Sequence, residues 1–177
     1  MIGQSQSGTG KTAAFVLTML SRINYDKEAI QAICLAPTRE LARQIVDVVK
    51  EMGKFTPVRV SLAIKEAVKK GEQLKDHIVV GTPGTVLDLL KKRSIDARNV
   101  NVFVLDEADN MLDLQGMGEQ SLRVKKYTRS SSRADTIVAC QGMPRCCCLV
   151  RRFPTKFVLL HIDFHQTQTR FHSKPKN

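Results

Sequence analysis

The residue types best suited to chemistry lie near the start of the chain, in Ser7-Gly8-Thr9-Gly10-Lys11-Thr12. The two glycines allow backbone N–H groups to turn inward around an anion, and a helix that follows points its positive end at the same place. Lys11 can reach the β and γ phosphates of a nucleotide, and the Thr12 hydroxyl can bind Mg²⁺. These six residues therefore predict a nucleoside triphosphate site. The alternative is an ordinary tight turn before a helix, and Ser5 stands where the strict P-loop pattern has glycine.

A second candidate site is an apolar run that ends in acidic residues, Val102-Phe103-Val104-Leu105-Asp106-Glu107-Ala108-Asp109. A strand that ends here would place Asp106 where it can hold the Mg²⁺ of a bound nucleotide, and Glu107 where it can polarise an attacking water. Acidic residues are also common at strand ends without any function, because such ends emerge into solvent. The glycine-rich loop upstream favours the catalytic interpretation.

Alternating helix-like and strand-like segments must position these residues. The spacing of apolar residues predicts helices over residues 10–23, 39–52 and 83–93, and strands over residues 32–36, 58–64, 77–80 and 100–105. Strands separated by helices of this length indicate βαβ units. We therefore expect a three-layer α/β fold, in which helices flank both faces of a parallel sheet and ligands bind at the carboxyl ends of the strands.

Four segments, in this order along the chain, resemble motifs I, Ia, Ib and II of DEAD-box ATP-dependent RNA helicases. They are residues 4–15, Ala36-Pro37-Thr38-Arg39-Glu40-Leu41-Ala42, Gly81-Thr82-Pro83-Gly84-Thr85 and Val104-Leu105-Asp106-Glu107-Ala108-Asp109. Three details resemble the subgroup that remodels mRNA–protein complexes at the nuclear pore: Ser5-Gln6-Ser7 before the glycines, Thr85, and the Asp-Asn-Met-Leu continuation at residues 109–112. The resemblance covers about residues 1–126 and implies the P-loop (RecA-like) version of the predicted fold.

The resemblance implies a role for each matching residue. Gly8, Gly10, Lys11 and Thr12 would bind the ATP phosphates and Mg²⁺, Asp106 would hold Mg²⁺, Glu107 would activate water, and Asp109 would couple the nucleotide state to RNA. One RNA strand would be contacted through its sugar–phosphate backbone by Pro37, Thr38, Arg39, Thr82, Pro83 and Gly84. The implied cofactors are ATP and Mg²⁺. The implied partners are single-stranded RNA and nuclear-pore or mRNA-export factors, which places the protein in the cytoplasm and nucleus, including the pore.

The residues themselves are compatible with RNA contacts, because threonine hydroxyls, helix N-termini and an arginine suit phosphate and 2′-OH groups without reading bases. Thr38 and Thr82 have a simpler explanation, since each stands next to a proline where a helix begins and could cap that helix. Without the resemblance, capping is the favoured interpretation.

Several family features are missing from the sequence. A helicase of this family has two RecA-like domains, because arginines from the second domain accelerate phosphoryl transfer by about 10³- to 10⁵-fold. This chain shows one such domain, lacks the adenine-reading segment before motif I, and has Ala139-Cys140-Gln141-Gly142 where relatives carry Ser-Ala-Thr after a strand near Ile137-Val138. We therefore expect a domain truncated at both ends, with weak nucleotide binding, negligible stimulated hydrolysis and no unwinding.

The composition changes in the last third of the chain. Residues 123–177 hold 12 Lys and Arg against 2 Asp and Glu, whereas residues 1–122 are nearly balanced. We expect a partial RecA-like domain over residues 1–126 and a divergent basic tail over residues 127–177. The tail is either an RNA-binding extension or an out-of-register or intron-read sequence, and its cysteines and apolar residues favour the second. Its cysteines lack zinc-site spacing, and a disulfide framework is not expected.

The sequence allows two other functions. A different P-loop enzyme, such as a nucleotide kinase or a GTPase, is one, but the Asn-Lys-x-Asp pattern of a GTPase is missing from the sequence. The other is a noncatalytic protein that binds RNA or a protein partner through the basic tail. No apolar run approaches the roughly 20 residues needed to cross a bilayer, so we expect no membrane insertion.

Overall fold

The computed structural model describes residues 11–67, 73–113, 117–129 and 135–139. Helices and strands largely alternate along these residues, as the sequence predicts. The helices are α1 (Lys11–Arg22), α2 (Arg39–Met52), α3 (Pro83–Lys91), α4 (Ala108–Asp113) and α5 (Met117–Arg129), with a short 3₁₀ helix, η1 (Ala97–Asn99). The strands are β1 (Ala32–Leu35), β2 (Val60–Ala63), β3 (Ile78–Gly81), β4 (Val102–Asp106) and β5 (Asp135–Ala139). None of these helices is both long enough and apolar enough to cross a membrane.

The strands form one parallel sheet in the order β2-β3-β1-β4-β5. The predicted α/β class and parallel sheet are therefore confirmed, and the expected strand near Ile137-Val138 is β5. The strand order differs from the chain order because the chain passes from β1 to the edge strand β2, returns through β3 beside β1, and then crosses to β4 on the other side of β1. Helix α5 continues to Arg129, and the boundary proposed at residue 126 stays a prediction.

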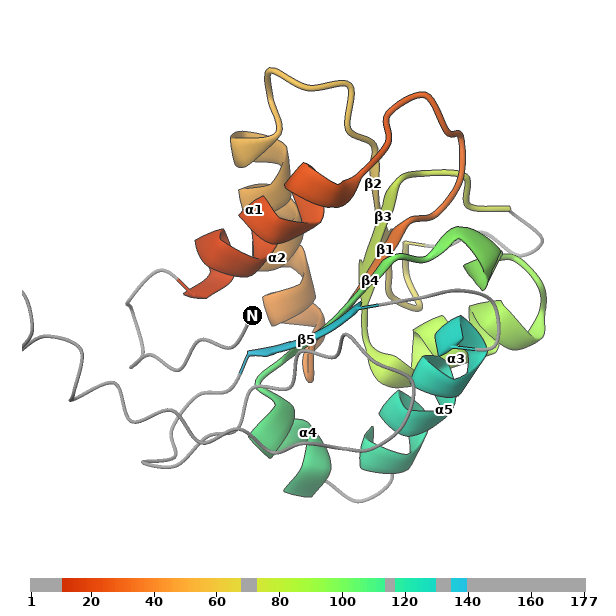
Figure 1. Ribbon diagram of the computed structural model, residues 1–177. Coiled ribbons are helices and arrows are strands. Elements are labelled where there is room, and N and C mark those ends of the chain that lie inside the picture. Colours follow the sequence, from red (N-terminus) through yellow and green to blue (C-terminus); the bar gives the residue numbers. More distant parts are fainter. Residues whose placement is uncertain (1–10, 68–72, 114–116, 130–134, 140–177) are drawn as a thin grey trace, which may run out of the picture.

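Successive residues of each strand face opposite sides of the sheet, which creates two cores. On β1, Ala32 and Cys34 pack with α1 and α2, whereas Ile33 and Leu35 pack with α3 and α5. Figure 1 shows the resulting layers, with α1 and α2 covering one face and α3 and α5 the other. Strands buried on both faces read as continuous apolar runs, which is why the sequence revealed them.

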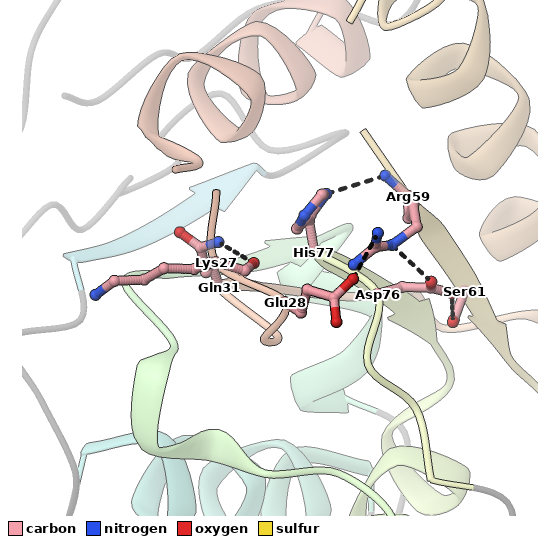
Figure 2. Close-up of polar contacts among 7 residues, drawn as sticks. All are labelled: Lys27, Glu28, Gln31, Arg59, Ser61, Asp76 and His77. Carbon is pink, nitrogen blue, oxygen red and sulfur yellow. Dashed lines mark hydrogen bonds and ion pairs between the residues drawn. The ribbon is translucent and has the colours of Figure 1, made fainter. Parts of the chain in front are cut away.

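The amino ends of three strands are joined by polar contacts around His77 (Figure 2). His77 directly precedes β3 and is buried, and its Nδ1 accepts a hydrogen bond from the Arg59 backbone N–H at 3.1 Å. The Arg59 side chain forms ion pairs with Glu28 at 3.3 Å and Asp76 at 3.7 Å. Among the described residues, no group hydrogen-bonds His77 Nε2. The imidazole is therefore held neutral in a site that does not favour a second proton.

This site makes stability depend on pH. Burial, and then the Arg59 charge, lower the pKa of His77, while Asp76 and Glu28 oppose the shift in part. As pH falls below about 6.5, the unfolded chain takes up a proton that the folded protein does not, so the free energy of unfolding decreases down to the folded-state pKa. We expect His77→Asn, which keeps an acceptor near Arg59 N–H but does not titrate, to flatten this decrease.

The measurement is urea unfolding of both proteins between pH 7.5 and pH 5. The comparison uses the difference in unfolding free energy between the two pH values for each protein, because His77→Asn also removes packing at every pH. Equal pH slopes for the two proteins would show that His77 is not the group responsible.

Candidate functional site

The candidate site lies along the carboxyl edge, which is the edge of the sheet formed by Ala63, Gly81, Leu35 and Asp106. Leu35 is in register with Gly81 on one side and with Leu105 on the other. The Ala36 backbone N–H also donates a hydrogen bond to the Gly81 carbonyl at 3.0 Å. The segments that follow β3, β1 and β4 consequently leave the sheet side by side. This arrangement brings the two predicted RNA motifs and the acidic motif to one edge.

Helix α1 brings Lys11 and Thr12 toward the same edge. The chain just after α1 is fixed at the amino end of β1, because the Asn24 backbone N–H donates to Gln31 Oε1 at 2.9 Å. Helix α1 packs against α2 and contacts β4 and β5, so it runs back across the sheet from the carboxyl edge. Lys11 and Thr12 are the first two residues of this helix, and both are partly buried. The other predicted phosphate-loop residues, Ser7, Gly8, Thr9 and Gly10, lie outside the described residues.

Asp106 is the last residue of β4, and only 6% of it is exposed. Its Oδ1 accepts a hydrogen bond from the Glu107 backbone N–H at 3.1 Å. Burial, and then the Asp106 charge, raise the pKa of the Cys34 thiol on β1. Cys34 is therefore a protonated core residue rather than a nucleophile.

Glu107 has an unusual backbone conformation, with φ at 50°. The left-handed region costs a non-glycine residue about 1–2 kcal/mol, and such strain is found often at functional sites. The turn allows α4 to begin directly after β4, and it directs the Glu107 side chain toward α4, where Asn110 Nδ2 donates to Glu107 Oε2 at 3.1 Å. Asp109 lies in α4, and the position of its side chain is outside what the structure describes.

The chemistry of these residues fits Mg²⁺. Among the described residues, no group of three or more His, Cys, Asp or Glu side chains could enclose a metal ion. Mg²⁺ does not need such a group, because it usually keeps several waters and binds one or two protein oxygens together with substrate phosphates. The Asp106 carboxylate and the Thr12 hydroxyl are oxygen ligands of this kind.

The two threonines of the predicted RNA motifs behave differently. Thr38 caps α2, because its Oγ1 accepts a hydrogen bond from the Leu41 backbone N–H at 3.2 Å. Thr82 occupies the corresponding position before α3 but makes no side-chain cap bond, and its Oγ1 is instead 3.1 Å from Thr85 Oγ1. Both threonines therefore occupy N-cap positions, as the capping interpretation expects, but only Thr38 makes the capping hydrogen bond. Pro83 and Gly84 form the first turn of α3, and Pro37 leads from β1 into the Thr38 cap.

Arg39, the charged member of these motifs, is the first residue of α2 and forms an ion pair with Glu66. Arg43 forms a second ion pair with the same carboxylate at 3.3 Å. Sequence analysis missed Arg43 and Glu66. The position of Arg43, four residues after Arg39 on a predicted helix, places the two side chains on one face and could have indicated it. Nothing local indicates Glu66, since it follows a different strand.

Comparison with known proteins gives the site a context. The chain is 66% identical over 125 residues to the ATP-dependent RNA helicase dbp5 of Schizosaccharomyces pombe, which covers 71% of this chain and 25% of that protein. The solved structure of S. cerevisiae Dbp5 bound to RNA and ADP BeF3 matches with a TM-score of 0.75 and 52% identity, covering 78% of this chain and 35% of that one. A variant of S. cerevisiae Dbp5 bound to Nup159, a Gle1 variant, IP6 and ADP matches with a TM-score of 0.75 and 51% identity, covering 79% and 37%.

This chain thus spans about a quarter of the length of the curated relatives it matches. The fold is that of the first RecA-like domain of these helicases, and the sequence is closely related to Dbp5. The family model for DEAD/DEAH box helicases matches residues 1–141. With that match spanning most of its residues, the chain belongs to the DEAD/DEAH box helicase family.

Proposed function

We propose that this chain binds ATP with Mg²⁺ at one part of the carboxyl edge and the backbone of one RNA strand at the adjoining part. The observation that carries the proposal is the register of Leu35 with both Gly81 and Leu105. That register makes the segments after β3, β1 and β4 neighbours, so a nucleotide site and a polar surface for a nucleic acid strand share one rigid sheet. A structural change at the nucleotide site can therefore be transmitted through the sheet to the RNA surface, and the reverse.

The nucleotide part of the site extends from the start of α1 to the end of β4. Lys11 and Thr12, together with Ser7, Gly8, Thr9 and Gly10, hold the phosphates, because the first turn of a helix supplies N–H donors and a positive dipole end. Asp106 and Thr12 hold Mg²⁺, which when bound offsets the negative charge of the phosphates. The structure of S. cerevisiae Dbp5 with ADP BeF3 supports this assignment by similarity.

Glu107 has a separate role, as the general base in ATP hydrolysis. A water attacks the γ-phosphorus, its proton passes to the Glu107 carboxylate, and the bond between the γ-phosphorus and the bridging oxygen breaks to leave ADP and phosphate. The contact from Asn110 at 3.1 Å holds one Glu107 oxygen, which orients the carboxylate. A single RecA-like domain is expected to hydrolyse ATP slowly, because arginines of a second such domain accelerate phosphoryl transfer.

The RNA part of the site consists of Pro37, Thr38 and Arg39 beside Thr82, Pro83 and Gly84. Capping does not compete with RNA at Thr38, because the cap uses the hydroxyl only as an acceptor and a hydroxyl can also donate one hydrogen bond. The N-termini of α2 and α3 both lie at this edge, and both suit phosphate oxygens. These contacts read the backbone and not the bases, so no sequence preference is expected. We infer that Asp109, in α4, couples the two parts.

Similarity also indicates a cellular role. Dbp5 relatives have been solved with RNA, Nup159, Gle1 and IP6. We infer that the chain acts in RNA strand remodelling during mRNA export, in the nucleus and cytoplasm and at the nuclear pore. Nucleoporins and export factors are the corresponding protein partners.

The nucleotide assignment is tested by removing the metal. We expect ATP to bind the purified chain weakly in the presence of Mg²⁺ and about tenfold more weakly after EDTA, a loss comparable to that of one hydrogen bond to a charged group, about 1.5–3 kcal/mol. Asp106→Asn, which leaves only Thr12 to hold the metal, should show a smaller dependence on Mg²⁺. Asp26→Asn, in the exposed loop after α1, is the matched control and should behave like the unchanged protein.

Isothermal titration calorimetry measures the affinities, and a phosphate-release assay measures turnover. RNA-stimulated phosphate release by the chain should stay near background. If the unchanged protein binds ATP with the same affinity with and without Mg²⁺, the proposed metal site is wrong. If RNA strongly stimulates phosphate release by this chain, the expectation that a second domain is needed is wrong.

A further inference from the structure

Two arginines of α2 and one glutamate after β2 form a charged cluster, Arg39–Arg43–Glu66, at the carboxyl edge. Glu66 Oε1 pairs with Arg39 Nη1, and Glu66 Oε2 pairs with Arg43 Nη2 at 3.3 Å. Each carboxylate oxygen therefore has its own guanidinium partner. The three side chains are about half exposed, at 51%, 49% and 57% for Arg39, Arg43 and Glu66, so the cluster can be reached from solvent.

The fold brings these residues together from distant parts of the sequence. Arg39 and Arg43 are four residues apart on α2, and thus lie on one face of the helix. Glu66 lies in a turn after β2, in which the Ala67 backbone N–H donates to the Ile64 carbonyl at 3.1 Å. Ala63, the last residue of β2, is in register with Gly81, which precedes Thr82. The cluster is consequently next to the segments proposed to hold RNA.

The net positive charge of the cluster favours the binding of an external anion, distinct from the Glu66 carboxylate. Two guanidinium groups face one carboxylate, which leaves an excess positive charge. Guanidinium groups match carboxylate and phosphate oxygens with the same geometry. A carboxylate held with one oxygen on each of two arginines therefore marks a place where a phosphate would also fit. Exposed ion pairs contribute only about 0.2–1 kcal/mol, so Glu66 can be displaced.

We propose that Arg39 and Arg43 together form a binding subsite for one phosphate of an RNA strand, and that Glu66 occupies this subsite until RNA displaces it. The proposal rests on the proposed RNA-binding function and extends it by two residues. Arg43 becomes a phosphate contact, and Glu66 becomes an intramolecular competitor that weakens binding. RNA is favoured over an acidic peptide because the Thr82 hydroxyl and the N-termini of α2 and α3 lie at the same edge.

The experiment measures binding of a fluorescently labelled, ten-nucleotide single-stranded oligouridylate to the full chain by anisotropy over a range of salt concentrations. Glu66→Gln removes the competing charge and is expected to tighten binding about two- to fivefold, in line with the modest strength of an exposed ion pair. Arg43→Ala is expected to weaken binding and to reduce the dependence of log affinity on log salt by about 0.7, the value for one phosphate contact with a single strand.

Matched controls separate these effects from general changes in charge. Glu51→Gln removes an exposed carboxylate near the other end of α2, where it pairs with Lys54, and should leave RNA affinity unchanged. Arg98→Ala removes an arginine that pairs with Asp96 just before β4, at the amino ends of the strands, and should not alter the salt dependence. All substituted side chains are exposed, so each variant should keep the thermal stability of the parent within a few degrees.

The outcomes distinguish this inference from the proposed function. If Arg39→Ala weakens RNA binding but Glu66→Gln does not tighten it, Glu66 is not a competitor and the inference fails while RNA binding stands. If Arg43→Ala has no effect while Arg39→Ala does, the two-arginine subsite is wrong. If neither Arg39→Ala nor Arg43→Ala changes RNA affinity, the proposed RNA surface itself is wrong.

Discussion

Replacing Lys11 by alanine is expected to weaken ATP binding by about ten- to a hundredfold, because a hydrogen bond to a charged group contributes about 1.5–3 kcal/mol. Lys11 is the first residue of α1, so its ammonium group adds a full positive charge to the partial charge at the helix N-terminus. Alanine is the best helix former, and the substitution should leave the helix intact. The loss should therefore be a loss of binding rather than of folding.

Calorimetric titration with ATP in the presence of Mg²⁺ provides the measurement. Lys50→Ala, at an exposed position in the last turn of α2, is the matched control, since it removes the same charge from another helix. Circular dichroism of both variants should match that of the parent. Equal ATP affinity in Lys11→Ala and the parent would show that the phosphates bind elsewhere. The roles assigned to Asp106 and Glu107 would then have no phosphate site beside them.

The second large effect concerns Gly81, at the end of β3. A Cβ atom at this position would lie 2.3 Å from the Ala63 carbonyl oxygen, 2.7 Å from Ala63 Cβ and 2.9 Å from its carbonyl carbon. Ala63 is the register partner of Gly81 on β2, so relief requires the two strands to separate. We expect Gly81→Ala to lower the free energy of unfolding by about 3 kcal/mol or more, at the upper end of the usual cost of overpacking.

Gly84→Ala is the matched control, three residues further along. Its Cβ would lie 3.0 Å from Gln120 Oε1 and 3.8 Å from Gln120 Cδ, which form the movable end of a side chain. Gly84 lies in α3, where alanine is favoured over glycine by about 0.5–1 kcal/mol, so the variant should be as stable as the parent or slightly more stable. Urea unfolding followed by circular dichroism compares the variants. Similar losses in both would show that the β2–β3 contact is not the cause.

Local sequence patterns were sufficient for most secondary structure. The apolar periodicity predicted a helix over residues 39–52, which is α2 to the residue, and the run of buried residues at 32–36 predicted β1 within one residue. These elements could be found because burial imposes a period of 3.6 on helices and a continuous apolar run on strands covered on both faces. The positions of Asp106 and Glu107 at the end of β4 followed from the same reasoning.

Other features could not be found in this way. The hydroxyl of Thr82 pairs with Thr85 instead of capping α3, although Thr38 caps α2 in an equivalent position. The left-handed turn at Glu107 occurs at a residue type that seldom adopts it. In each case the choice between two local options depends on groups that the neighbouring sequence does not specify.

The sequence by itself determined the elements, the family and the residue types available for phosphate, metal and RNA contacts. Only the tertiary structure decided the strand order, the alignment of Leu35 with Gly81 and Leu105, and the meeting of Arg39 and Arg43 with Glu66. The physical reason is the distance along the sequence between the residues that interact. Helices and buried strands are specified by residues within a few positions of each other, whereas strand pairing and ion pairs between separate elements depend on how the whole chain packs.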